Sequence, residues 1–217
     1  MKLHVIKTGV LNVNTLVVPT ENGKCFVVDP AACSLSSDEK IITEYIKSQN
    51  LICEAIILTH THFDHITGIL ELKKTFPSAK IFIHKSEIME LSGNGCVGPM
   101  NQAVLNFFGI PELLDLVSMQ PAADDFVYDG NSFFGWKVIH TPGHTPGSIC
   151  LYKSKTENCS EGFLISGDTL FDYGCYGRTD MYGGNESEIQ KSINKLNKEI
   201  PHGTLVYPGH DNYGFKF

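Results

Sequence analysis

Three histidines and an aspartate directly follow a short apolar run near residue 60. The segment Glu54–Leu58 contains four consecutive apolar residues, which is typical of a strand buried on both faces. Residues two apart on an extended chain point the same way, so His60 and His62 can converge on one ion. Asp64 and His65 lie at the turn into a helix, where their side chains can point toward a position next to that ion. Imidazoles with a carboxylate are zinc-type ligands, so this pattern predicts a metal site where the strand ends.

Three later fragments also place a metal-binding side chain after a strand, among Gly and Pro residues that would hold a rigid loop. They are the stretches 141–147 (TPGHTPG), 166–169 (SGDT) and 207–211 (YPGHD). These fragments add His144, Asp168 and His210 as candidate ligands. Two metals that share Asp168 would use all seven candidates: His60, His62, Asp64, His65, His144, Asp168 and His210.

The remaining pattern predicts an α/β fold with two β-rich halves. Strands are expected at 3–8, 13–19, 25–29, 54–58, 80–83, 133–140, 148–153, 162–165 and 204–207. Helices are expected after a capping box from Ser36 to Glu39, across 66–76, across 85–91 and across 186–199. The chain has strands followed by β-α alternation, and this order then occurs a second time. Such an order favours two β-rich halves packed face to face with helices outside.

The segment 92–121 is rich in Gly and Pro and lacks clean periodicity. It predicts a partly helical flap carrying Met100, Phe107 and Phe108. These side chains either select the substrate or complete the core under a long loop. Both interpretations stay open at this point.

Composition narrows the class of protein. The 217 residues carry 17 Lys and Arg against 24 Asp and Glu, a formal charge of −7, which argues against a nucleic-acid partner. No apolar run approaches the roughly 18 residues that span a bilayer, and no signal-peptide pattern opens the chain, so we expect no membrane partner. Seven cysteines without a C-x-x-C pair predict reduced thiols in the cytoplasm. We expect residues 1–217 to form one domain.

The order H-x-H-x-D-H, PGHTPG, SGD and PGH resembles the metallo-β-lactamase fold superfamily. Within it, the stretches 167–171 (GDTLF) and 177–180 (GRTD) resemble glyoxalase II-like hydrolases, which are hydroxyacylglutathione hydrolases, and the related persulfide dioxygenases. The resemblance runs from about Val13 to Tyr213. It implies a four-layer αββα sandwich of mixed sheets, with the site at one edge of the paired sheets.

The resemblance also implies roles for the seven ligands. One metal would be held by His60, His62 and His144, and a second by Asp64, His65 and His210, with Asp168 bridging. The expected ions are two divalent metals, zinc first, with iron or manganese as alternatives. A hydroxide between the metals would attack a carbonyl carbon, and an acyl thioester is the expected small-molecule substrate. Asp64 and Asp168 are the expected catalytic residues, Asp64 by orienting the hydroxide and Asp168 by keeping the metals in register.

Two features keep alternatives open. The stretches 174–180 (GCYGRTD) and 209–213 (GHDNY) resemble the persulfide dioxygenases, in which a single iron would use His60, His144 and Asp168. The chain ends seven residues after His210, so we expect no separate C-terminal glutathione-binding domain and doubt glutathione as the carrier thiol. A lactone or a small phosphodiester is a third candidate substrate. The oligomeric state, monomer or dimer, does not follow from the sequence.

Overall fold

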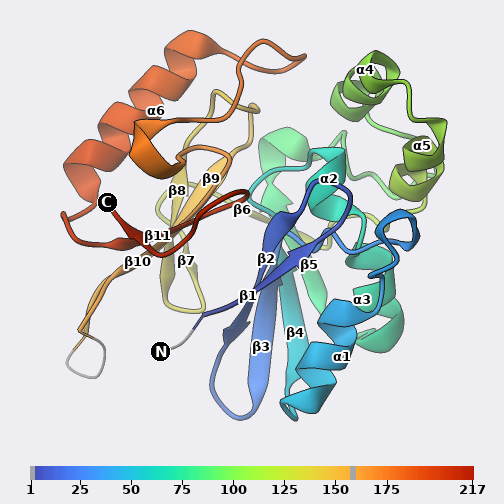
Figure 1. Cartoon of the computed structure of the whole chain (residues 1–217), viewed down its shortest axis with the longest axis horizontal. Helices are drawn as coiled ribbons and strands as arrows, with labels where there is room; N and C mark the ends of the chain where they lie inside the picture. The colour runs from blue at the N-terminus through green and yellow to red at the C-terminus, as the bar shows by residue number, and fades with distance from the viewer. Residues whose placement is uncertain (1–2, 157–159) are drawn as a thin grey trace.

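Two six-stranded sheets pack against each other in the computed structural model, which describes residues 3–156 and 160–217 (Figure 1). A cluster of buried side chains joins them: Leu16, Phe26 and Ile57 of the first sheet lie with Trp136 and Ile165 of the second. Helices cover the outer faces, so the fold is the predicted αββα sandwich.

The first sheet follows chain order from β1 to β6. Strands β1, β2 and β3 pair antiparallel, and β3 to β6 pair parallel. The bounds are β1 (His4–Thr8), β2 (Val13–Pro19), β3 (Lys24–Val28), β4 (Ile52–Ile57), β5 (Lys80–His84) and β6 (Asp125–Val127). Side chains alternate between the faces, so Leu16 of β2 points toward the second sheet while Val17 packs under the outer helices.

The second sheet has the order β12-β11-β10-β9-β8-β7. Only β10 and β11 pair parallel; the other neighbours are antiparallel. The bounds are β7 (Ser132–Phe133), β8 (Trp136–His140), β9 (Ile149–Lys153), β10 (Phe163–Gly167), β11 (Leu205–Pro208) and β12 (Phe215–Lys216). Because β10 and β11 run in the same direction, Asp168 and His210 leave the sheet at the same edge.

Helices complete the outer layers (Figure 1). The first sheet is covered by α1 (Ile41–Ser48) and α3 (Ile69–Thr75), with the single turn α2 (Phe63–Ile66) before α3. The second sheet is covered by α6 (Glu186–Glu199). Helices α4 (Pro99–Phe108) and α5 (Pro111–Ser118) lie together beyond the end of the first sheet.

Several local expectations were wrong. Ser36 does not cap a helix, because its hydroxyl donates to Asp38 and to the Cys33 carbonyl, and α1 begins at Ile41. The expected helix at 85–91 is only a 3-10 turn, Lys85–Glu87, and the one at 66–76 divides into α2 and α3.

The expected strand at 133–140 is a tight hairpin of β7 and β8. Phe134 and Gly135 turn the chain with φ of 49° and 74°. The short strands β6 and β12 were not expected. The other predicted strands and the helix at 186–199 are confirmed within a few residues.

The flap consists of two regular helices. Gly98 and Pro99 open α4, and Gly109 closes it in the left-handed conformation with φ of 67°. Met100 is buried in the fold, whereas Phe107 is 71% exposed and Phe108 is 47% exposed. The core interpretation therefore holds for Met100 alone.

Two observations bear on the environment of the chain. The six cysteines within residues 3–156 and 160–217 are free thiols, and Cys159 lies outside the described residues. None of the helices in these two ranges is long and apolar enough to cross a membrane.

The buried His84, stacked on the partly buried His140, makes the fold sensitive to acid. The rings of His84 and His140 stack with centroids 4.0 Å apart, and His84 Nδ1 accepts a hydrogen bond from the Ser86 backbone N–H. Burial and then the charge of His140 lower the pKa of His84 from 6.5 to about 4, against a smaller opposing effect of Asp129. The folded state therefore favours neutral His84. This contribution to stability is complete above pH 6.5 and is lost as the pH falls toward 4.

We expect His84→Gln to reduce the dependence of the unfolding free energy on pH between 6.5 and 4, as measured by urea denaturation at fixed metal content. His202→Gln, at an exposed histidine, serves as the control and should keep the wild-type slope. An unchanged slope in His84→Gln would contradict this assignment.

Candidate metal centre

All seven predicted ligands lie together where strands end at one edge of the sandwich. His60 and His62 follow β4, and Asp64 and His65 belong to α2. The others come from the second half: His144 lies between β8 and β9, Asp168 follows β10 and His210 follows β11. Three groups have potential ligand atoms within 4.8 Å of one another: His60, His62 and His144; His60, His65 and Asp168; and Asp64, His65 and His210.

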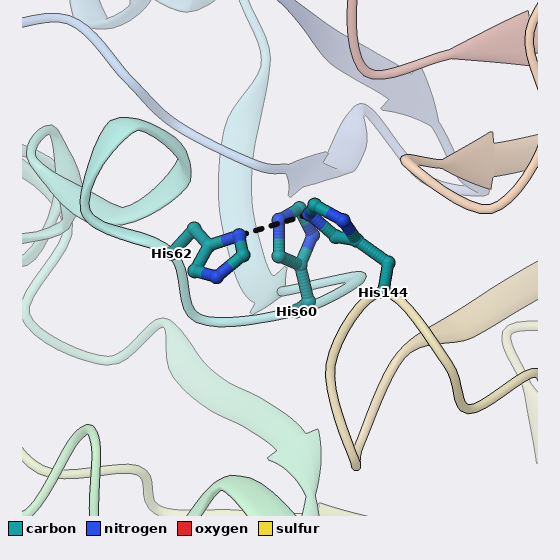
Figure 2. Close-up of side chains that lie close together, drawn as sticks. All are labelled: His60, His62 and His144. Atoms are coloured by element: carbon teal, nitrogen blue, oxygen red, sulfur yellow. Dashed lines mark hydrogen bonds between the residues drawn. The ribbon is translucent and has the colours of Figure 1, made fainter. Parts of the chain in front are cut away.

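The first group consists of three imidazoles that converge on one point (Figure 2). His62 Nδ1 lies 2.9 Å from His144 Nε2. The His60 ring centroid is 4.9 Å from that of His62 and 4.8 Å from that of His144. Three imidazole nitrogens at this separation can serve as ligands of one transition-metal ion.

The second group adds a carboxylate to two imidazoles. Asp64 Oδ2 lies 3.2 Å from His210 Nε2 and 3.5 Å from His65 Nε2. The two imidazole nitrogens, His65 Nε2 and His210 Nε2, are 3.2 Å apart. This group can hold a second ion beside the first.

Asp168 lies between the two groups. Its Oδ1 is 3.6 Å from His65 Nε2, and its Oδ2 is 3.5 Å from His144 Nε2 and 3.6 Å from His210 Nε2. Gly209 makes this approach possible, because a Cβ at that position would collide with Asp168 Oδ1. The group of His60, His65 and Asp168 was not expected as a unit, and it links the two predicted sets.

Backbone carbonyls set the orientation of two ligands. His144 Nδ1 lies 2.8 Å from the carbonyl oxygen of Arg178, and His210 Nδ1 lies 3.2 Å from that of Leu11. A carbonyl oxygen can only accept, so both Nδ1 atoms carry the proton. The Nε2 atoms of both histidines thereby face the site, as in metal-binding histidines with outer hydrogen-bond partners.

Asp29 supports two further ligands from behind. Its own φ of 49° shows that it also turns the chain. Its Oδ2 is 3.1 Å from His65 Nδ1 and accepts a hydrogen bond of 2.6 Å from the Thr59 hydroxyl. Because the Thr59 hydroxyl donates to Asp29, it accepts from His60 Nδ1 at 3.2 Å. The Nε2 atoms of His60 and His65 are thus left to face the metal groups.

Electrostatics divide the site into neutral and charged parts. Burial first, and then the neighbouring histidines, hold the pKa values of His60 and His62 well below 6.5, so these imidazoles are neutral and able to bind a metal. Burial opposes charge on His65, but Asp64 and Asp168 raise its pKa to about 10. Burial would raise the pKa of Asp64, yet His65 and His210 hold it below its ordinary value.

The donor set fits metal ions. Asp168 Oδ1 and His60 Nε2 are buried and have no hydrogen-bond partner within the described ranges. A buried carboxylate is costly without a compensating cation or donor. By contrast, the buried Asp29 accepts from the Thr59 N–H at 2.7 Å and from its hydroxyl. The unsatisfied atoms therefore point to the place where cations would bind.

Glu87 is a site-supporting residue that the sequence analysis missed. It is 1% exposed, and its Oε2 accepts from the N–H of Thr61 at 2.9 Å and from the Thr61 hydroxyl. Its Oε1 accepts from the Gly147 N–H at 2.8 Å. Thr61 lies between His60 and His62, and Gly147 lies three residues after His144. A single carboxylate therefore ties together the two loops that supply the first group.

We expect Glu87→Gln to weaken metal binding at the first group by about 10- to 100-fold, because an amide NH₂ would face one of these N–H donors. Metal affinity would be measured by competition with a chromogenic chelator. Glu188→Gln, on the exposed face of α6, is the control and should bind metal as the wild type does. Equal affinity in Glu87→Gln and wild type would show that the loops hold their positions without this carboxylate.

A cavity of about 280 Å³ opens beside the ligands. Its lining comprises Leu11, His62, Phe63, Asp64, Val104, Phe108, His144, Asp168, Phe171, Tyr176, Gly177, Arg178, Met181 and His210. A larger hollow of about 670 Å³ is lined by Lys24, Glu54 and Trp136 among others and contains none of the seven ligands. The smaller cavity is therefore the one that adjoins the chemistry.

The chain belongs to the metallo-beta-lactamase superfamily, whose family model matches residues 8–210. Among its relatives, "Probable metallo-hydrolase YqgX" of Bacillus subtilis is 31% identical over 213 residues, covering 97% of this chain and 90% of that protein. The hydroxyacylglutathione hydrolase of Pelagibacter ubique is 30% identical over 211 residues, covering 97% of this chain and 71% of that protein.

Solved structures agree with this membership. The crystal structure of the B3 metallo-beta-lactamase BLEG-1 has a TM-score of 0.77 at 27% identity, covering 99% of this chain and 94% of that one. TTHA1623, in a di-iron-bound form, has a TM-score of 0.74 at 25% identity, covering 96% and 92%. With the His and Asp groups described above, these similarities define a metallo-hydrolase whose candidate metal sites are typical of the dinuclear centre of this superfamily.

Proposed function

We propose that the chain hydrolyses acyl thioesters with two divalent metal ions, zinc in the first instance. The observation that carries this proposal is the position of Asp168, whose two carboxylate oxygens face histidines of both groups. A shared carboxylate of this kind supports two ions rather than one. The hydroxyacylglutathione hydrolase among the relatives, a thioester hydrolase by name, supports the reaction.

The metal pair, when bound, would supply a Lewis acid and a water whose pKa is lowered to about 7. The chain's own residues provide its surroundings. Phe63 and Val104 line the cavity with apolar surface and limit the access of water. Asp64 would orient the attacking water through its carboxylate. The described residues that line the cavity include no Ser, Cys or Lys, which supports water rather than one of these side chains as the attacking group.

Two further features support the setting we propose for this reaction. Because the described cysteines are free thiols, a reducing compartment such as the cytoplasm suits the chain. The net charge of −7 favours a small-molecule substrate over a nucleic acid, and nothing in the lining suggests a membrane partner. Iron is the alternative metal, since TTHA1623 was crystallised with two irons.

A mononuclear iron persulfide dioxygenase is the second candidate function. The observation in its favour is the approach of Asp168 to His144, whose ligand atoms are 3.5 Å apart. Such a site would use His60, His144 and Asp168 and would leave His62 and His210 without a metal. The participation of His210 in a separate ligand group favours the hydrolase.

The test is release of thiol from S-lactoylglutathione and from acyl thioesters of N-acetylcysteamine by protein loaded with zinc, iron or manganese. We expect hydrolysis, and we expect Asp168→Asn to lower kcat/KM by at least about 100-fold, because both ions lose a ligand. Asp211→Asn, at an exposed carboxylate next to His210, is the matched control and should keep the activity. Oxygen consumption with a persulfide, together with no thioester hydrolysis, would replace the proposal with the dioxygenase.

A further inference from the structure

One wall of the cavity beside the metal groups is built from apolar side chains. Phe63 of α2, Val104 and Phe108 of α4, and Met181 line it together. Phe63 and Val104 are 4% and 5% exposed and belong to the core under the first sheet, and Met181 packs against the same core. The Phe63 and Phe108 rings are 6.5 Å apart. The wall is therefore a continuation of the core that opens next to His62.

The described lining offers no unpaired Lys or Arg to an anionic ligand. Arg178 is the only Lys or Arg among the described residues of the lining. Its guanidinium makes two hydrogen bonds with the Asp180 carboxylate, at 2.8 and 2.9 Å. Because this charge is already paired, the carboxylates of a glutathione carrier would find no free cationic side chain in the lining.

The size of the cavity sets the scale of its occupant. About 280 Å³ lies just below the range of roughly 300–1,000 Å³ for ligand sites. It is also about twice the roughly 150 Å³ of an apolar cavity that accepts one benzene ring. Such a space suits a chain of about six carbons rather than a whole tripeptide conjugate.

Resting on the function proposed above, we propose that the substrate carries an unbranched apolar acyl chain of medium length, which lies against the wall of Phe63, Val104, Phe108 and Met181. Phe108 is the specificity-determining residue of this wall. It is 47% exposed and ends α4 at the mouth of the cavity, so an acyl chain can cover its ring. Small hydroxyacyl groups such as lactoyl would bury less apolar surface there.

Phe107 provides an internal comparison. It precedes Phe108 on α4 and contacts its ring with centroids 5.4 Å apart, but it is 71% exposed and does not line the cavity. Removing either ring takes the same apolar side chain from the same helix. Only the loss of Phe108 changes the wall that we assign to the acyl chain.

The test has a binding arm and a turnover arm, both with the metal-loaded protein. Isothermal titration with S-ethyl, S-butyl and S-hexyl N-acetylcysteamine, which cannot be hydrolysed, measures affinity against chain length. Acetyl, butyryl and hexanoyl thioesters of the same thiol, together with S-lactoylglutathione, measure kcat/KM. We expect both quantities to improve by about two- to fourfold per added methylene. Phe108→Ala should flatten this dependence, and Phe107→Ala should keep it.

The outcomes separate this inference from the proposed function. An affinity that rises with chain length, without any hydrolysis, would keep the acyl pocket and remove the thioesterase. Hydrolysis with no dependence on chain length, or a higher kcat/KM for S-lactoylglutathione than for the hexanoyl thioester, would overturn the acyl pocket. Equal flattening by Phe107→Ala and Phe108→Ala would also overturn the role of Phe108.

Discussion

The Asp168 carboxylate, of which Oδ1 is buried, is the constraint around which the rest of the site is arranged. It leaves β10 at the point where β10 and β11 run parallel, so it meets His210 at the same edge of the sheet. Its Oδ1 accepts no hydrogen bond among the described residues, and a buried polar atom without a hydrogen bond is costly. Cations bound between the two groups would offset this cost. The five histidines around it supply nitrogen ligands for such cations.

Two other buried carboxylates show how a fully satisfied site is built. Asp29 and Glu87 both accept from backbone N–H groups, and neither faces the metal groups directly. Asp29 lies behind His65, and Glu87 joins the loops of His60 and His144. Together with the carbonyls of Arg178 and Leu11, they fix the imidazoles before any ion arrives. Asp29 and Glu87 thus position candidate ligands, whereas Asp64 and Asp168 are candidate ligands themselves.

The ligands could be predicted from the sequence because each follows a strand within a few residues. Buried apolar runs indicate strands, and His or Asp residues among glycines and prolines just after them indicate loops at one edge. The supporting contacts could not be predicted in this way. Glu87 and Gly147, which it contacts, are 60 residues apart in the sequence. His144 and His210 bond to the backbone carbonyls of Arg178 and Leu11, and a pattern of side-chain types does not indicate such backbone contacts.

Local rules failed where tertiary contacts compete with them. Ser36 fits the spacing of a helix cap, but its hydroxyl donates a hydrogen bond to Asp38 instead. Ser36 therefore belongs to a short turn that precedes α1. The run 133–140 alternates like one strand, yet Phe134 accepts a positive φ so that β7 and β8 can pair as a hairpin. In the flap, both helices begin at a proline and α4 ends at Gly109, and these residue types are equally typical of loops.

The central claim is that the seven residues hold two ions that share Asp168. Anomalous X-ray diffraction at the zinc, iron and manganese edges, on protein purified without added metal, tests it most directly. The account predicts two metal peaks, one beside His60, His62 and His144 and one beside Asp64, His65 and His210, each within bonding distance of Asp168. A single peak held by His60, His144 and Asp168 would contradict it.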